Sequence, residues 1–325
     1  MTEASPRPSP ISVRVPASTS NLGPGFDFLG LALNLTLEVT VLGPAQGAQH
    51  EFAALGGAAA DWPSASDNRV TRALDFALRS GNHAPRSVRM SVQSEIPIGR
   101  GFGSSGAATI AGLLLGHALA GNDPPIESLV SQGAFLEGHP DNSTASLLGG
   151  CTLAIPGCSD DRAVTTELGQ GNWRVVRQAI HPSIGIAIAW PEQPLPTEQG
   201  RRALPEQVSF ADAVENPRRA AALLEGLRTG DPEWLALGGE DRLHVPFRLP
   251  LIPGASRALD AARAAGAWLA TISGSGSGLI ALASKADCSA VADAMAAELE
   301  REQGQATSRV VTPVLTPAQV ELAPE

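Results

Sequence analysis

Residues 95–115 read EIPIGRGFGSSGAATIAGLLL, and the rest of the chain is best understood from this stretch. Before it, residues 87–94 (SVRMSVQS) alternate apolar and polar side chains, as a half-buried strand does. Residues 107–120 are small and apolar, which is typical of a buried helix. The turn between them leaves several successive amides uncovered, at Gly99, Gly101, Gly103, Ser104, Ser105 and Gly106. Because N–H groups at a helix N-terminus bind phosphate oxygens, the stretch predicts an anion site.

The same turn could also indicate other kinds of fold or site. Gly101, Gly103 and Gly106 fit the G-x-G-x-x-G pattern of dinucleotide-binding folds, but such folds need a parallel strand directly after the helix. Residues 121–125 lead into a second helical pattern instead. A Walker P-loop needs a lysine after its last glycine, and Lys285 is the one lysine of the chain. A flexible loop capped by one of the two serines stays open as the alternative.

Composition narrows the class of protein. The chain has 325 residues, enough for two domains or one large α/β domain, and its 43% hydrophobic and 17% charged residues are those of an ordinary globular protein. The net charge is −10 and no basic run occurs, which argues against nucleic acid or a membrane surface as the main partner. A nucleotide is still allowed, because a phosphate loop binds through backbone dipoles.

The cysteines and the first residues indicate a cytoplasmic setting. Cys151, Cys158 and Cys288 are an odd number without the spacing of a metal site, and the first two are expected to be buried small residues. Residues 1–10 (MTEASPRPSP) lack the apolar core of a signal peptide and are expected to form a frayed tail. No apolar run reaches the length of a membrane span. We expect a reducing compartment and no structural metal.

The first part of the chain places two polar residues between strands. Residues 11–15 (ISVRV) and 31–42 (LALNLTLEVTVL) alternate as strands do, and Pro16 is expected to end the first. Asn21 and Asp27 lie in the turn-rich segment between them. They either make local turns or face a cleft and bind a small polar substrate.

Two further segments precede and follow the glycine-rich turn. Residues 46–66 are rich in Ala, Gly and Pro and are expected to form a surface loop, and residues 67–80 a helix capped by Asp67. Residues 126–137 have a helical pattern that ends in Glu137. His139, Asp141 and Asn142 follow at once, as a capped turn or as part of a site.

The last part of the chain adds two arginines and a second glycine-rich turn. Residues 184–190 (IGIAIAW) predict a strand buried on both faces. Arg201 and Arg248 are either surface residues or a pair that binds a carboxylate, which a planar guanidinium does better than lysine. Residues 268–283 predict two strands joined by GSGSG, and residues 309–315 the last strand.

Three stretches resemble the GHMP kinases, a family named for galactokinase and the homoserine, mevalonate and phosphomevalonate kinases. Residues 97–108 (PIGRGFGSSGAA) resemble its phosphate loop, and residues 16–27 (PASTSNLGPGFD) and 137–142 (EGHPDN) resemble the homoserine kinase versions of two other motifs. Residues 18–20 and 143–145 depart slightly from the pattern, and Ser277-Gly278 replaces the usual Pro-Thr of a third motif, so Gly274 and Gly276 are carried over only weakly.

The resemblance implies an α+β architecture, the GHMP kinase fold. Residues 1–172 would form an N-terminal α/β nucleotide-binding domain, like domain 2 of ribosomal protein S5, with a left-handed crossover. Residues 173–325 would form a ferredoxin-like C-terminal α/β domain. A homodimer is expected from the family.

The resemblance also implies a reaction, the ATP-dependent phosphorylation of the side-chain hydroxyl of L-homoserine in threonine biosynthesis. The residues implied for the nucleotide are Asn68, Pro97, Ile98, Gly99, Arg100, Gly101, Phe102, Gly103, Ser104, Ser105, Gly106 and Ala107. The residues implied for the substrate are Asn21, Asp27, His139, Asp141, Thr197, Arg201 and Arg248. Glu137 with Ser104 or Ser105 would bind Mg²⁺. For Asn68, a plain helix-capping role and a role near the adenine are equally expected.

The catalytic group implied by the motifs is Ser105, Glu137 and Asn142. Some GHMP kinases have an aspartate as general base where this chain has Asn142, and an amide cannot accept a proton usefully at neutral pH. We therefore expect catalysis by positioning and Mg²⁺. Two other functions remain open: a GHMP kinase for another small hydroxyl compound, and a catalytically silent paralogue that binds nucleotide or amino acid.

Overall fold

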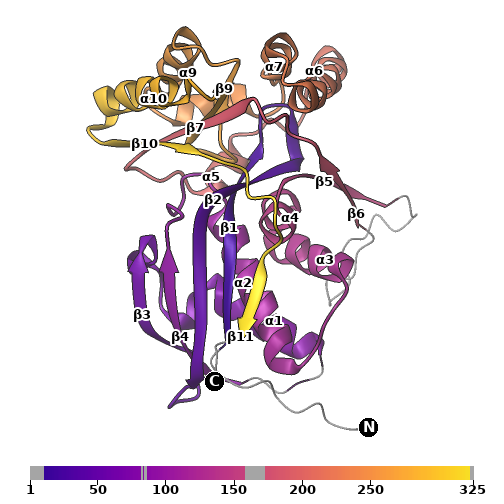
Figure 1. The fold of residues 1–325 in the computed structure, drawn as a ribbon, viewed down its shortest axis with the longest axis vertical. Helices are drawn as coiled ribbons and strands as arrows, with labels where there is room; N and C mark the ends of the chain where they lie inside the picture. Colours follow the sequence, from indigo (N-terminus) through magenta and orange to yellow (C-terminus); the bar gives the residue numbers. More distant parts are fainter. Residues whose placement is uncertain (1–10, 82, 84–85, 158–172, 323–325) are drawn as a thin grey trace.

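The computed structural model describes residues 11–322 except 82, 84–85 and 158–172. It consists of two parts, each a β-sheet with helices packed on it (Figure 1). The tail expected at residues 1–10 and the burial expected for Cys158 lie outside the described residues. Cys151 is buried, as expected.

A seven-stranded sheet forms the larger part. Its path is β11-β1-β2-β4-β3, with β5 paired to β2 and β6 paired to β5. Of these pairs only β3–β4 is parallel, joined through helix α1. The strands are β1 (Ile11–Asn21), β2 (Gly25–Pro44), β3 (Glu51–Gly57), β4 (Val88–Ser94), β5 (Cys151–Pro156), β6 (Trp173–Gln178) and β11 (Gln319–Leu322).

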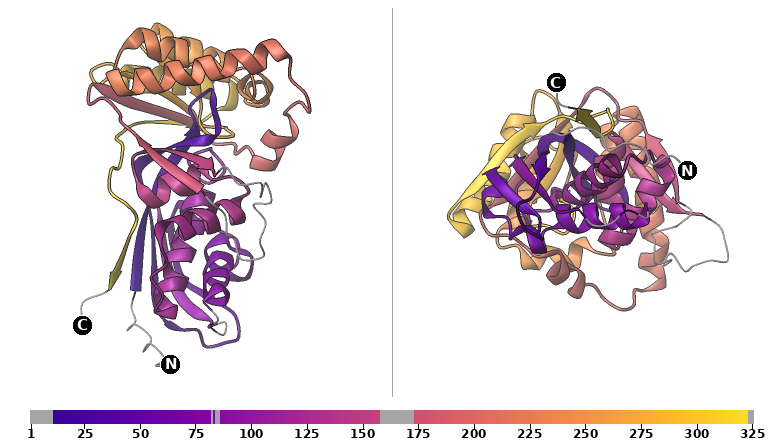
Figure 2. Two further views of the ribbon diagram at one scale, coloured as in Figure 1. Left: turned by 90° about the vertical axis from the view of Figure 1, so that its right-hand side faces the viewer. Right: turned by 90° about the horizontal axis from the view of Figure 1, so that it is seen from below.

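Helices cover one face of this sheet (Figure 2). They are α1 (Arg69–Ser80), α2 (Ser104–Ala120), α3 (Ile126–Glu137) and α4 (Asp141–Leu148). Helix α2 is buried almost throughout, which its apolar sequence predicted. A Cβ atom at Gly112 or Gly116 would collide with the backbone of α1, so these small residues let the two helices pack closely.

The smaller part has the ferredoxin-like order that the family resemblance implied. Strands β7 (Ile184–Pro191), β8 (Leu269–Ile272), β9 (Leu279–Ser284) and β10 (Ala306–Val311) form an antiparallel sheet in the order β10-β7-β9-β8. Helix α10 (Cys288–Gln303) connects β9 to β10. The connection from β7 to β8 contains α5 (Thr197–Arg202), α6 (Phe210–Thr229), α7 (Pro232–Gly238), α8 (Val245–Arg248) and α9 (Ala255–Ala264).

Two predictions about the first strands were wrong. Strand β1 does not end at Pro16 but continues to Asn21, because a register shift after Pro16 accommodates a residue without an N–H. Residues 46–66 are not only a loop, since β3 and the 3₁₀ turn Ala58–Asp61 lie within them and the 3₁₀ turn Ala65–Asp67 begins in them. Strand β3 is held by hydrogen bonds to β4, which local composition does not reveal.

Two other local predictions need correction. The cap of α1 is not Asp67 but Asn68, whose Oδ1 accepts a hydrogen bond from the N–H of Val70 at 2.9 Å. The last predicted strand, residues 309–315, is β10, and β11 after it was not foreseen. The boundary at residues 172 and 173 stays a prediction, although β6 and β11 both belong to the large sheet.

Within the described residues, every helix is too short or too polar to cross a lipid bilayer.

Candidate active site

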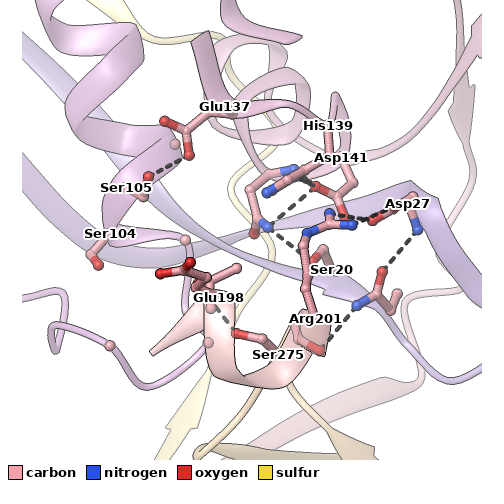
Figure 3. A pocket seen from close by; sticks show the side chains of 18 of the residues that line it. Ser20, Asp27, Ser104, Ser105, Glu137, His139, Asp141, Glu198, Arg201 and Ser275 are labelled. Carbon is pink, nitrogen blue, oxygen red and sulfur yellow. Dashed lines mark hydrogen bonds and ion pairs between the residues drawn. The ribbon is translucent and has the colours of Figure 1, made fainter. Parts of the chain in front are cut away.

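A pocket of about 290 Å³ lies where the two parts of the molecule meet, between the N-terminus of α2 and the glycine-rich turn after β8 (Figure 3). Most of the predicted site residues reach it from separate segments of the chain. The lining includes Asn21, Asp27, Gly99, Gly101, Gly103, Ser104, Ser105, Gly106, Glu137, His139, Asp141, Asn142, Thr197, Arg201 and Arg248. The structure therefore brings the predicted polar clusters together.

The glycine-rich turn before α2 has the backbone of an anion site. Gly99, Gly101 and Gly103 all have a left-handed φ, between 67° and 74°. Gly103 is the N-cap of α2 and provides no side chain to cap it, so the first N–H groups of the helix remain available at the pocket. A helix N-terminus of this kind binds phosphate.

The turn after β8 packs directly against this loop. The hydroxyl of Ser273 donates a hydrogen bond to the Gly101 carbonyl at 2.7 Å, and the N–H of Gly278 donates to the Arg100 carbonyl at 3.1 Å. A side chain at Gly101 would collide with the Ser273 backbone. The second glycine-rich turn thus supports the first.

Glu137, at the end of α3, is held against the start of α2. Its Oε2 accepts a short hydrogen bond from Ser105, and its Oε1 accepts one from Thr109 at 2.6 Å. Arg69 forms an ion pair with the same carboxylate at 2.9 Å, although the Glu137 side chain is only 3% exposed and that of Arg69 is 53% exposed. Ser105, rather than Ser104, is the serine that contacts the carboxylate (Figure 3).

His139 and Asp141, which follow Glu137 in the chain, form a buried pair at the pocket. His139 Nδ1 lies 2.6 Å from Asp141 Oδ1. Burial alone would raise the pKa of Asp141, but the hydrogen bond and charge of His139, with the N–H of Asn142, lower it below its usual value. Burial lowers the pKa of His139, and Asp141 more than reverses this, so that the net shift is upward. Both groups are therefore favoured in their charged forms.

The side chain of Asn142 is fully occupied by neighbouring side chains. Its Oδ1 accepts a hydrogen bond from Ser18 at 3.0 Å, and its Nδ2 donates to Ser20 at 2.9 Å and to Asp141 at 3.3 Å. Asn142 thus connects α4 to β1. The geometry suits an organising residue and offers no proton acceptor.

Asp27 and Arg201 form a bidentate ion pair with distances of 2.8 and 3.1 Å. Asp27 has a φ of +60°, and its N–H donates to the Oδ1 of Asn21 at 3.0 Å. Asn21 also donates to the Gly274 carbonyl at 3.0 Å. Asn21 therefore holds Asp27 in an unusual backbone conformation, which is a common feature of functional sites.

Arg248 is 2% exposed and lies beside this pair. Its Nε donates to the Gly200 carbonyl at 3.1 Å, and its guanidinium lies 5.1 Å from the centre of the Phe26 ring. Burial, and after it the charge of Arg201, lowers the pKa of Arg248 to about 10. Arg248 remains charged at neutral pH.

Some residues implied for the nucleotide are near the pocket without lining it. The Arg100 side chain turns away and donates to backbone carbonyls that include that of Glu192, and Phe102 is buried against Trp190. The others that do not line the pocket are Asn68, Pro97, Ile98 and Ala107. Asn68 has the capping role, and its role at the adenine stays a prediction.

Several lining or supporting residues were not predicted. Arg69 looked like an exposed helix residue, and Ser18, Ser20 and Thr109 carried no signal beyond their place near a motif. Glu198 and Ser275 also line the pocket, and the Ser275 hydroxyl lies 3.4 Å from that of Thr197. Phe26, inside the motif at residues 16–27, could have been singled out because it lies directly before Asp27.

Family models match both parts of the chain. The model described as the GHMP kinases N terminal domain matches residues 68–150, and that described as GHMP kinases C terminal matches residues 223–301. The first range contains the phosphate loop and Glu137. The second contains Arg248 and the turn after β8.

Relatives and solved structures agree with these matches. The chain is 39% identical over 293 residues to a homoserine kinase of Synechococcus sp. (strain RCC307), with 90% of each chain covered. A homoserine kinase crystal structure from Cytophaga hutchinsonii has a TM-score of 0.80 and 26% identity, and covers 97% of this chain and 98% of its own. A mevalonate kinase from L. major, at 14% identity and a TM-score of 0.67 over 96% and 97% of the chains, shares the fold. By its motifs, its fold and these relatives, the chain belongs to the GHMP kinases and, within them, to the homoserine kinase family.

Proposed function

We propose that the protein transfers the γ-phosphoryl group of ATP to the side-chain hydroxyl of L-homoserine, which gives O-phospho-L-homoserine and ADP. One observation carries this proposal. A single pocket has an uncapped helix N-terminus on one side and the charged residues Asp27, Arg201 and Arg248 on the other. Such a pocket suits a phosphate donor and a zwitterionic acceptor.

The phosphates of ATP would lie on the turn at residues 99–106, where the N–H groups of the first turn of α2 face the pocket. Mg²⁺ usually binds through one or two carboxylates together with substrate phosphates. The Glu137 carboxylate and the Ser105 hydroxyl, which touch each other at this turn, are oxygen donors of the kind it needs. When bound, Mg²⁺ would neutralise developing charge on the phosphates.

The amino-acid end of the substrate would meet the charged wall. Arg248 and Arg201 would bind the α-carboxylate, and Asp27 or Asp141 the ammonium group. The Arg201–Asp27 pair already holds one charge of each sign at 2.8 Å, so it can exchange its internal contacts for those of a zwitterion. The substrate hydroxyl would then point towards the γ-phosphoryl group.

Positioning, rather than a carboxylate base at residue 142, would drive the transfer. The amide of Asn142 is occupied by Ser18 and Ser20, and the lowered pKa of Asp141 makes that carboxylate a weak base. The hydroxyl proton would pass to phosphate or solvent. A rate that follows the titration of a carboxylate in the enzyme–substrate complex, and that Asp141→Asn abolishes without loss of homoserine affinity, would contradict this mechanism.

The test is ADP release with Mg·ATP and each of L-homoserine, L-threonine, L-serine, shikimate and mevalonate. We expect a clear preference for L-homoserine and a raised KM in Arg248→Ala. Preference for another alcohol would indicate a different GHMP kinase. Background rates with all five, combined with intact ATP binding, would indicate a regulator without catalytic activity.

Homodimerisation remains a proposal from the family. Sedimentation equilibrium of the full chain across a range of concentrations would test it.

A further inference from the structure

A buried histidine lies directly behind Arg248. His244 precedes α8 and is 0% exposed, and its ring stacks on Phe26 with centroids 5.0 Å apart. Its Nδ1 lies 3.3 Å from Nη1 of Arg248, and its Nε2 lies 2.8 Å from the carbonyl oxygen of Gly23. His244 therefore joins the arginine to the turn between β1 and β2.

These two contacts fix the protonation of the ring. A carbonyl oxygen can only accept, so Nε2 must carry the proton that it donates to Gly23. A guanidinium can only donate, so Nδ1 must be unprotonated to accept from Arg248. The ring is thus neutral. Burial lowers the pKa of His244 most, the Asp241 carboxylate 3.9 Å from Nε2 opposes this, and the charge of Arg248 lowers it further, so the net shift is downward and agrees with a neutral ring.

The acceptors of Arg248 are uncharged, unlike that of Arg201. Among the described residues, Arg248 donates to the carbonyls of Gly200 and Gly274 and to His244, and it takes part in no ion pair within 4.0 Å. Arg201 is already paired with Asp27. The neutral ring orients the Arg248 guanidinium without cancelling its charge, and Nη2, which has no hydrogen bond within the described part of the chain, is left for an anion.

The histidine is itself held from both sides. The Asp241 carboxylate accepts hydrogen bonds from the backbone N–H groups of Leu243, His244 and Val245, at 3.2, 2.7 and 2.7 Å. On the other side, Asn216 donates to the Pro24 carbonyl at 3.3 Å, next to the Gly23 contact. The ring therefore has a fixed place relative to both parts of the molecule.

We propose that His244 is a positioning residue for substrate recognition: its neutral ring accepts from Arg248, donates to Gly23, and so holds the guanidinium as the charged anchor of the substrate carboxylate. This inference rests on the proposed function, because the carboxylate is that of homoserine. His244 does not line the pocket, but it orients Arg248, which does.

Two substitutions separate the two hydrogen bonds of the ring. The Oδ1 of His244→Asn takes the place of Nδ1 and can still accept from Arg248. The Nε2 of His244→Gln takes the place of the ring Nε2 and can still donate to Gly23, but leaves Arg248 without its acceptor. We expect H244Q to raise the KM for L-homoserine about tenfold, the loss of roughly one hydrogen bond to a charged group, and H244N to raise it much less. The KM for ATP should not change in either variant.

A second measurement excludes a merely structural effect. 3-Aminopropan-1-ol is homoserine without its carboxylate, so its kcat/KM should be the same in wild type and H244Q. In the Arg248→Ala background, H244Q should cause no further loss with L-homoserine, because the histidine acts through the arginine. Melting temperatures of the four proteins serve as the folding control.

The outcomes separate this inference from the proposed function. Wild-type protein that does not phosphorylate L-homoserine overturns both. Wild-type protein that does so, while H244Q lowers kcat/KM equally for both alcohols or adds its full loss to that of Arg248→Ala, overturns the role of His244 alone.

Discussion

Arg201 and Asp27 are joined by two hydrogen bonds, of 2.8 and 3.1 Å, although 174 residues separate them in the sequence. Their side chains are 37% and 35% exposed, so the pair faces the pocket. A zwitterionic amino acid carries the same two charges as this pair. The pocket thus presents one positive and one negative side chain before a substrate binds. To bind a zwitterion, Arg201 and Asp27 must break or share the hydrogen bonds between them.

The losses caused by removing Arg201 and Asp27 singly should add up to more than the loss caused by removing both. We expect Arg201→Ala and Asp27→Ala each to lower kcat/KM by about 10- to 100-fold, since each deletes charge-assisted hydrogen bonds and leaves the other charge unpaired. The double variant should lose less than the sum by about 1 kcal/mol. Steady-state kinetics of the four proteins measure this coupling, and simple additivity would show that the pair has no role as a unit.

The two serines at the start of α2 should differ in importance. Ser105 contacts Glu137, so Ser105→Ala should lower kcat by about tenfold or more, whereas Ser104→Ala should have a smaller effect. Glu137→Gln, which keeps the shape and removes the charge, should lower kcat by about 100-fold and raise the Mg²⁺ concentration needed for half-maximal rate. Equal losses in the two serine variants would contradict the assignment of Ser105 as the partner of Glu137.

A carboxylate at residue 142 should not create a general base. In Asn142→Asp an oxygen would replace the Nδ2 that donates to Ser20 and Asp141, next to a carboxylate already present at 3.3 Å. Repulsion should destabilise the protein by about 2 kcal/mol and leave kcat unchanged or lower. Thermal unfolding and kcat at neutral pH test this, with Asn142→Ser as a control that removes the amide without adding charge. A faster enzyme would show that positioning alone does not set the rate.

The sequence predicted which residues form the site, but not the contacts that these residues make with one another. The motifs at residues 16–27, 97–108 and 137–142 each carry several polar residues in a fixed order, and all three meet at the pocket. The prediction assigned Asp27 and Arg201 to the substrate, and the structure shows that they also bind each other. Spacing within a motif indicates which residues share a turn, but ion pairs between distant segments depend on the folded chain.

The residues and the strand that the sequence did not predict were missed for the same reason: their partners lie far away in the sequence. Arg69 follows the helix cap in a pattern that any exposed helix could have, and only the end of α3 gives it a partner. His244 is not part of any sequence motif for metal binding or catalysis. Its proposed role depends on Gly23, which lies 221 residues away in the sequence. Strand β3 lacks strong alternation because it lies at the edge of the sheet, where β4 provides its hydrogen bonds.

The His139–Asp141 pair should stabilise the protein most at mildly acid pH. Asp141 has a lowered pKa, so its contribution is present above its usual 3.8 and is lost as the pH falls through the folded value. His139 has a raised pKa, so its contribution is present below its usual 6.5 and is lost as the pH rises through the folded value. The difference in unfolding free energy between wild type and His139→Gln should therefore be largest between about pH 4 and 6.5.

A second buried histidine provides the control for this pH dependence. Burial lowers the pKa of His117, and the hydrogen bond that its Nε2 donates to Gln132 Oε1 only partly opposes this. Stability due to a neutral His117 should be lost as the pH falls below 6.5, so the difference between wild type and His117→Gln should shrink on acidification, opposite to that for His139. Denaturant unfolding at several pH values measures both, and parallel trends would contradict the His139–Asp141 assignment.

The phosphate loop should not tolerate a side chain at Gly101, and the reason can be separated from backbone strain. Gly101 and Gly304 both have a left-handed φ, of 74° and 86°. An alanine at Gly304 would meet nothing within 4 Å, whereas one at Gly101 would press into the Ser273 backbone of the opposite turn. Such a sparsely populated backbone conformation costs alanine about 1–3 kcal/mol, so Gly304→Ala should lower the melting temperature and leave catalysis intact. Gly101→Ala should in addition displace the turn and raise the KM for ATP by about tenfold or more. If the two variants lose equal stability and neither affects ATP, the contact between the two glycine-rich turns does not shape the nucleotide site.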